Sequence, residues 1–388
     1  MSQSSKPASP LSSPLIWGIT ALGALGVIGS YLAAPHERFW ANWVLWFVLM
    51  FTLGLGALFI VALEHLVSAK WSVPVRRIPE RIATLLIPAV PVGLIALGAL
   101  PVIYPGADTA KALLNPILKG KAFWLSIPFF SVRTVIAFVL CLIGLALLVG
   151  GSLKQDTTKN PTFNIRARKF APAFMAIFAL VITLIAFDWI SGLTPEWYSD
   201  IFGVYVFAGA FLSGLAATAL AVLYLQDQNR LDGVKGDHLY NLGAFLFAFT
   251  VFWSYIGFAQ YMLMWYANLP DEVIWYKVRL AGSWRAITII LASMHFILPF
   301  FALVTRDSKK DPKRLRRVAY LMLGAHVLDM YWLIFPALGA TPHFSWPEIS
   351  FALFFIGAIL LWIRGAMQKG EDMPVGDPFL REGLEFRL

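Results

Sequence analysis

Charged residues are scarce in this sequence. Asp, Glu, Lys and Arg make up only 14% of its 388 residues, whereas a soluble domain carries roughly 25%. The formal net charge of +9 comes from the segments between apolar blocks and is not concentrated in a patch that would bind nucleic acid. The composition therefore excludes an ordinary soluble domain and predicts no nucleic-acid partner.

Cysteine is almost absent, because Cys141 stands alone. One cysteine allows no disulfide within the chain, no thiolate iron–sulfur site and no C-x-x-C-H attachment of haem. We therefore expect no covalently bound cofactor and no metal centre in this chain.

Apolar residues dominate the sequence at 59%, and they occur in blocks. About twenty apolar residues suffice to cross roughly 30 Å of hydrocarbon, and a backbone in lipid must satisfy its own hydrogen bonds, so the blocks should be helices. The predicted fold class is an all-α integral membrane protein with about ten transmembrane helices. They are placed at 14–33, 39–66, 81–103, 122–150, 169–190, 198–226, 238–268, 282–304, 315–337 and 348–366.

The distribution of basic residues predicts the orientation. With the N-terminus inside, 23 of the 31 Lys and Arg lie in inside segments and 6 in outside loops. Basic residues favour the cytoplasmic side, so both termini should be cytoplasmic. No signal-peptide cleavage site follows the first block. We expect a multi-pass membrane protein whose two ends lie in the cytoplasm, with lipids as its surroundings.

Short similar strings suggest an internal repeat. Ser131-Val-Arg133-Thr134 returns as Ser283-Trp-Arg285-Ala286, and Gly192-Leu-Thr194-Pro195 returns as Gly339-Ala-Thr341-Pro342. The matched strings are separated by four helices. An even number of helices preserves the orientation in the membrane, so the repeats would be parallel. The resulting division has two four-helix bundles between peripheral first and tenth helices. The segments are 1–13 (disordered), 14–38 (helix 1), 39–190 and 191–337 (bundles), 338–366 (helix 10) and 367–388 (tail).

Ionisable residues inside apolar blocks need a reason, because each costs roughly 2.5–3.5 kcal/mol at the helix centre. Arg133, Arg285, Asp188 and Asp200 should form a polar layer on the outer side. One reading is a proton pathway, and the other is structural pairing between helix ends. For Arg285, close to the interface, a snorkelling side chain suffices.

Two histidines lie deep in predicted helices. His326 and Asp329 are three residues apart and share a helix face, so they could carry protons or join two helices by a hydrogen bond. His295 is expected to be a satisfied core histidine. Glu64 and His65 end the second block and are read either as the mouth of an inner half-channel or as a solvated helix end.

The seventh block is rich in aromatic residues and carries a polar amide, Gln260, among them. Flat apolar ligands such as quinones prefer aromatic walls with few polar groups, although a core with an interfacial aromatic belt explains the same pattern. The quinone-proximal candidates are Trp253, Tyr255, Gln260, Tyr261 and Trp265.

Two stretches resemble a known family. The string Asp188-Trp189, Pro195-Glu-Trp197, Phe202-Gly203-Val-Tyr205 is similar to the F subunit of bacterial alternative complex III, in the NrfD-like family of polysulfide-reductase membrane subunits. The segment from His238 through Asn268-Leu-Pro270 resembles it too. The resemblance covers the fifth to eighth helices best, and the length near 390 favours the F subunit over the longer C subunit.

The resemblance implies a subunit of a quinol:electron-carrier oxidoreductase in a respiratory or photosynthetic chain. Its partners would be a C-type sister membrane subunit, a periplasmic iron–sulfur subunit and haem c subunits, which alone carry the clusters and haems. This chain would support the complex, contact menaquinone or another quinone and take part in proton translocation. It would be accessory and not itself catalytic. The pathway candidates are Arg133, Asp188, His326, Asp329, Arg285, His295, Glu64 and His65.

Two other functions stay open. A stand-alone secondary transporter fits the repeat and the deep ionisable pair, but transporters usually interrupt helices at matched positions. Pro88, Pro91 and Pro101 in the third helix have no equivalents in the seventh. A purely structural membrane anchor is the other alternative.

Overall fold

Ten helical spans run side by side in a computed structural model that describes residues 13–388. Within that range they are long and apolar enough to cross a membrane, which confirms the predicted all-α fold class of a multi-pass membrane protein. The spans are Pro14–Ala33, His36–Leu66, Arg77–Ile103, Ile127–Thr158, Thr162–Leu193, Phe202–Asp227, Gly236–Ala267, Gly282–Leu303, Pro312–Leu338 and Trp346–Met367. The predicted disordered segment 1–13 lies outside the described residues except for its last position.

Six spans are wholly or nearly single helices. These are α1 (Ser13–Ala33), α2 (His36–Leu66), α12 (Phe202–Asp227), α13 (Gly236–Ala267), α18 (Pro312–Ile334) with the turn η8 (Phe335–Leu338), and α19 (Trp346–Met367). The first turns carry ordinary start signals. For example, Asp311 accepts a hydrogen bond from the backbone N–H of Lys313 at the start of α18, and Ser345 and Glu348 form a capping box on α19.

Four spans are interrupted. The third consists of α3 (Arg77–Ala83), α4 (Leu86–Ala96), η2 (Leu97–Ala99) and α5 (Leu100–Ile103). The fourth, fifth and eighth contain π-helical turns, which are common at functional sites. Their parts are α9 (Ile127–Leu145), η4 (Ala146–Gly150) and α10 (Gly151–Thr158); α11 (Thr162–Ile185), η5 (Ala186–Ile190) and η6 (Ser191–Leu193); and α15 (Gly282–Ala292), η7 (Ser293–Ile297) and α16 (Leu298–Leu303).

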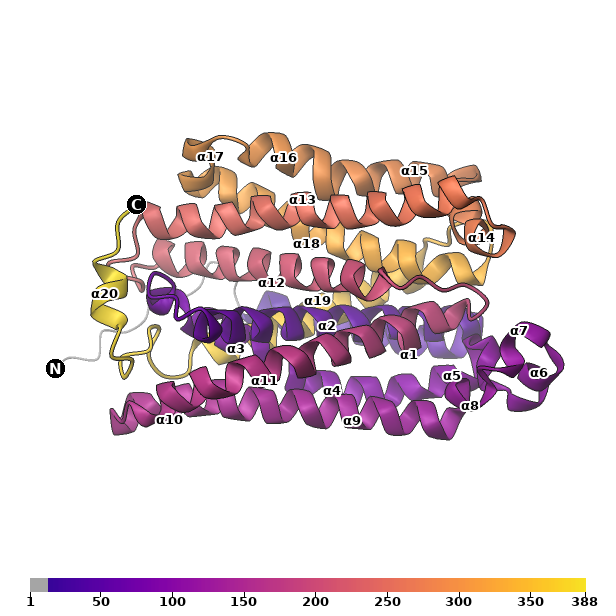
Figure 1. The fold of residues 1–388 in the computed structure, drawn as a ribbon, viewed down its shortest axis with the longest axis horizontal. Helices are drawn as coiled ribbons and strands as arrows, with labels where there is room; N and C mark the ends of the chain where they lie inside the picture. Colours follow the sequence, from indigo (N-terminus) through magenta and orange to yellow (C-terminus); the bar gives the residue numbers. More distant parts are fainter. Residues whose placement is uncertain (1–12) are drawn as a thin grey trace.

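Short helices close the two ends of the molecule. The end that carries the start of α1 and the C-terminus, here called the basic end, has η1 (Val73–Val75), α17 (Arg306–Lys310) and α20 (Leu380–Leu384). The opposite end has η3 (Pro105–Ala107), α6 (Thr109–Leu114), α7 (Pro116–Lys119), α8 (Ala122–Leu125) and α14 (Pro270–Arg279) (Figure 1). The start of α1 and the C-terminus share the basic end, as an even number of spans requires.

Several predicted boundaries were wrong. The third span begins at Arg77 and not at 81, the fifth begins at Thr162 and not at 169, and the fourth ends at Thr158 and not at 150. An apolar block shows only the part of a helix that lies in the hydrocarbon. The helix itself can continue beyond it, where its polar residues find hydrogen-bond partners. The predicted start at 122 also merged α8 with α9, which are separated at Ser126.

The two helices α2 and α12 form the centre of the protein. They are almost wholly buried and pack on each other along their length. Gly56 of α2 allows the close approach, because a Cβ atom there would lie 2.0 Å from the carbonyl oxygen of Ala210. By contrast, α1 and α19 pack mainly on each other at the periphery. The division into two repeated bundles stays a prediction.

Candidate functional site

The central polar cluster is built around Asp329, which lies on α18 and is 1% exposed. Tyr205 of α12 donates a hydrogen bond from its hydroxyl to Oδ1 at 2.6 Å. Trp253 of α13 donates from Nε1 to Oδ2 at 3.3 Å. Three different helices thus meet at one carboxyl group, and hydrogen bonds offset part of the cost of burying it.

Two histidines belong to the same cluster. Nε2 of His326 lies 3.2 Å from the hydroxyl oxygen of Thr52 on α2, while its Nδ1 has no hydrogen-bond partner among the described residues. Both ring nitrogens of His295 also lack one there. The His295 ring packs edge-on against Trp253, with 4.0 Å between centroids.

His326 and Asp329 lie close together on α18 but bind different partners. They share the buried face of α18, and a Cβ atom at Gly209 of α12 would lie 3.5 Å from atoms of both. The carboxylate, however, takes its hydrogen bonds from Tyr205 and Trp253. His295 lies in the core as predicted, at 1% exposed, but neither of its ring nitrogens has a hydrogen-bond partner among residues 13–388.

A cavity of about 330 Å³ adjoins this cluster. It lies between α13, α14, α15, η7 and α18, where α13 packs on η7 and α16 but makes little contact with α15. The two residues that bind Asp329, Tyr205 and Trp253, form part of its wall. The remaining wall is chiefly aromatic and aliphatic, with the polar side chains of Ser254, Gln260 and Thr288.

Three of the five quinone-proximal candidates line this cavity, namely Trp253, Gln260 and Tyr261. The other two do not: Tyr255 is 63% exposed and Trp265 is 66% exposed, on the outer surface of α13. The helical period explains the split, since positions 253, 257, 260 and 261 recur on one face.

The second polar site joins Arg133 of α9 to Asp188 of η5. Nε donates to Oδ2 at 3.0 Å and Nη2 donates to Oδ1 at 2.9 Å. Trp124 adds a hydrogen bond from its indole to Asp188, and its ring lies 4.0 Å from the guanidinium carbon. This pair is buried and fully hydrogen-bonded, which is the arrangement that a structural role requires.

The predicted four-residue polar layer is only half correct. Asp200 is exposed. Arg285 is exposed as well and donates from Nε to the carbonyl oxygen of Leu280, close in sequence. Neither residue joins Arg133 and Asp188, because both side chains point away from the buried pair into exposed positions.

The sequence analysis missed Arg279, the last residue of α14. It is 2% exposed and donates hydrogen bonds to the carbonyl oxygens of Trp332 and Leu333 at the end of α18. Its guanidinium carbon lies 3.4 Å from the centroid of Trp275. Arg279 thereby fixes the end of α18 beside the cavity. In the sequence, Arg279 falls between two predicted transmembrane helices and is indistinguishable from an ordinary charged residue of an outer loop.

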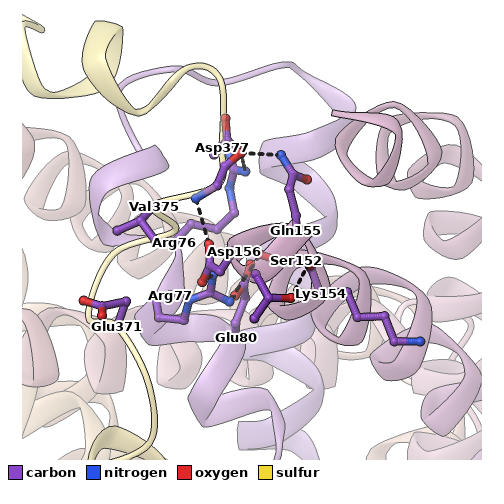
Figure 2. A network of polar contacts seen from close by, with 12 residues as sticks. Arg76, Arg77, Glu80, Ser152, Lys154, Gln155, Asp156, Glu371, Val375 and Asp377 are labelled. Carbon is purple, nitrogen blue, oxygen red and sulfur yellow. Dashed lines mark hydrogen bonds and ion pairs between the residues drawn. The ribbon is translucent and has the colours of Figure 1, made fainter. Parts of the chain in front are cut away.

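A third polar cluster lies at the basic end, and Figure 2 shows the part of it around Arg76, Arg77 and Asp156. Glu64, at the end of α2, receives a hydrogen bond from Nε of Arg76 at 3.1 Å. Arg77 forms ion pairs with Glu80 and with Asp156 of α10. His65 has an unpartnered Nε2 and lines a very small cavity with Arg76. The reading of Glu64 as a solvated helix end was wrong.

The run Arg76-Arg-Ile-Pro-Glu-Arg81 is the sequence signal for this cluster. In the predicted layout the run falls in an inner loop, except for Arg81, which begins the predicted third helix. All of its charged residues are at most 5% exposed. Charged residues are almost never so buried unless they are paired, and here the partners come from distant segments.

The C-terminal tail, residues 368–388, supplies several of those partners. Asp372 pairs with Arg81 of α3 and with Arg230, which follows α12. Asp377 receives a hydrogen bond from Arg76 at 2.7 Å, and the backbone N–H of Gly376 donates to Asp156. The tail therefore crosses the basic end near Val375 and Asp377 and ties the two halves of the chain together (Figure 2).

Acid should release the tail. Partial burial raises the pKa of Asp372, but the hydrogen bonds and charges of Arg230 and Arg81 outweigh burial and hold the pKa below its ordinary value. A carboxyl group whose pKa is lower in the folded than in the unfolded protein adds to the free energy of unfolding at any pH above its unfolded pKa of about 4. This added stability is lost as the pH falls through the pKa of the folded state. A nitroxide on Glu371→Cys, in a Cys141→Ala background, should become mobile below about pH 4.

The matched control for that measurement is Asp372→Asn in the same labelled protein. Its nitroxide should be mobile at neutral pH as well, because the carboxylate that Arg81 and Arg230 hold is gone. A label that stays immobile in this variant would show that Asp372 does not hold the tail.

Residues 13–388 contain no group of three or more His, Cys, Asp and Glu side chains that could hold a metal ion. No protein-family model matches the chain, and no curated protein matches it significantly. The structure thus supports the all-α membrane fold, and the relationship to alternative complex III stays a prediction.

Proposed function

We propose that this multi-pass membrane protein is an accessory subunit of a quinol:electron-carrier oxidoreductase, in which it contacts quinol and moves protons. The proposed partners are a sister membrane subunit and subunits with haem c and iron–sulfur clusters, in a bacterial cytoplasmic membrane. The observation that carries the proposal is the direct connection between a membrane-facing aromatic cavity and a buried carboxyl group. Tyr205 and Trp253 line the cavity and bind Asp329.

The chemistry of this connection suits proton transfer. A carboxyl group at depth costs several kcal/mol and marks a proton relay more often than a packing element. Tyr205 accepts and donates protons through one hydroxyl group, so it can link the cavity to Asp329. The unpartnered nitrogens of His295 and His326 provide the next exchangeable sites in the same cluster.

A stand-alone transporter built from two equivalent repeats would interrupt helices at matched positions. The third span is broken into several helices and the corresponding seventh span is the single helix α13, although the fourth and eighth spans both contain a π-helical turn. Purification in mild detergent checks the difference, since co-purifying haem c and iron–sulfur subunits support the complex and a lone solute-binding protein contradicts it.

Asp329→Asn should lower proton movement coupled to quinol oxidation in the assembled complex. Acid–base groups in place contribute about 10²–10⁴-fold to a proton-transfer step, so we expect a loss of at least about tenfold in proton release per complex. The measurement is proton release by the purified complex in vesicles, scaled to haem content. Asparagine keeps the size of the side chain and removes only the exchangeable carboxyl proton.

The control is Tyr255→Phe, which changes an exposed tyrosine of α13, the helix that also carries Trp253, and should leave proton release unchanged. A structural anchor would behave differently. It would give fewer assembled Asp329→Asn complexes but normal proton release per complex, and that result would refute the proposed role.

A further inference from the structure

The small cavity beside His65 at the basic end, here called the inner chamber, contains a polar atom without a partner. His65 lies in the last turn of α2 and is 3% exposed. It lines the chamber, and its Nε2 has no hydrogen-bond partner among residues 13–388. Such a buried polar atom in a native protein calls for an explanation, and an ordered water molecule is a common one.

The size and the charges of the inner chamber fit one water molecule. Its volume is about 10 Å³, about the space that a single water requires. Arg76 in the wall repels a cation, and the carboxylates of Asp156 and Asp377 repel an anion. Water is neutral and both donates and accepts hydrogen bonds, so it satisfies Nε2 in either tautomer of the ring.

The C-terminal tail forms one wall of the inner chamber. Pro374 and Asp377 of the tail line it together with residues of α2, α10 and α11. Oδ2 of Asp377 accepts hydrogen bonds from Arg76 at 2.7 Å and from Asn164 of α11 at 2.9 Å. Figure 2 shows Asp377 beside Arg76, where the tail passes over the ends of the helices. The tail thus separates the chamber from the surface of the basic end.

Gly376 lets the tail lie directly on α10. Nε2 of Gln155 donates to the carbonyl oxygen of Gly376 at 2.9 Å, and the backbone N–H of Gly376 donates to Asp156 at 2.9 Å. A Cβ atom at Gly376 would lie 2.2 Å from the carbonyl oxygen of Gln155. Any side chain at this position would therefore lift the tail from α10.

We infer that one water molecule binds Nε2 of His65 in the inner chamber and that residues 374–377 are the lid of this site. With the lid closed, the ring contacts only the enclosed water. When the lid lifts, solvent on the side of the basic end reaches His65, whose imidazole can take up or release a proton. The basic end thus carries a gated proton-exchange site. This inference does not depend on the quinol contact or on Asp329, so each can fail without the other.

Labelling of the full-length protein with diethylpyrocarbonate, which acylates histidine nitrogens that solvent reaches, tests the lid. In the wild type, mass spectrometry should find that His65 reacts at least about tenfold more slowly than the exposed His343. Gly376→Val should raise the rate at His65 at least about tenfold, because the opened tail no longer protects the ring. Val375→Ala is the matched control, since the side chain of Val375 is 41% exposed, and it should leave His65 protected.

His295 reports whether each variant is folded, because it is 1% exposed and should stay unlabelled. If Gly376→Val also exposes His295, Asp377→Asn replaces it, since this change weakens the tie to Arg76 without adding bulk. A wild-type His65 that reacts as fast as His343 would overturn the lid. An unchanged rate at His65 in a folded tail variant would overturn it too.

A density map of the same protein, kept with whatever subunits accompany it, tests the water. At a resolution that shows ordered waters, one peak should lie about 3 Å from Nε2 of His65. His65→Leu should remove the peak, because the polar atom that binds the water is gone. A chamber without a peak in the wild type, or a peak with the density of an ion, would overturn the water site.

Discussion

Asp188→Asn is expected to destabilise the protein by about 3–5 kcal/mol, because it leaves the guanidinium of Arg133 buried without its carboxylate. Arg133 is 6% exposed and Asp188 is 3% exposed, and each uses two atoms in the pair. The stacked ring of Trp124 compensates only a part of the charge. The loss should be visible as a lower midpoint in detergent-induced unfolding.

The double variant Arg133→Met with Asp188→Leu separates pairing from function. Replacing both charges by apolar groups of similar size is often neutral or stabilising, so most of the lost stability should return. Arg285→Gln is the matched control, since Arg285 occupies the equivalent place in the second repeat string but is exposed. It should change the free energy of unfolding by less than about 0.5 kcal/mol. A loss of several kcal/mol there would contradict the difference between the two arginines.

Gly56→Leu should prevent accumulation of folded protein. Even the first atom of a side chain at Gly56 would lie 2.0 Å from the carbonyl oxygen of Ala210, so α2 and α12 would have to separate along the centre of the protein. Overpacking of this kind costs about 1–3 kcal/mol for small additions, and we expect that range for Gly56→Ala. Helix association in lipid depends on close packing of small residues, so leucine should abolish it.

Gly150→Ala provides the comparison for Gly56. Gly150 lies in η4 of the fourth span, and no atom lies within 4 Å of a Cβ atom placed there. Its yield after extraction into detergent, followed by size-exclusion chromatography, should equal that of the wild type. Equal yields for Gly56→Leu would show that α2 and α12 do not pack as closely as the structure has them.

The sites differ in how far the sequence could predict them. Asp329 and His326 were recognisable because a charged residue within an apolar block is conspicuous. Tyr205 and Thr52 could not be assigned to them, since each contributes from a helix more than a hundred positions away. Aromatic residues occur on several faces of α13, so their spacing alone did not show which face lines the cavity.

The basic end shows the opposite difficulty. Arg77 and Glu80 looked like interfacial charges that water and headgroups would solvate. Their burial depends on α10 and on the tail crossing above them, and no local pattern encodes the path of a tail. The repeat strings misled in a similar way, since they equated Arg133 with Arg285, although only Arg133 has a carboxylate partner.

From the sequence alone, the length of the apolar blocks and the need for internal backbone hydrogen bonds in hydrocarbon predict an all-α membrane protein of about ten spans. The folded chain was needed to learn which buried polar groups meet and where a cavity opens. Those outcomes depend on contacts between helices that are distant in sequence, and apolar helices of similar composition carry little local information about their neighbours.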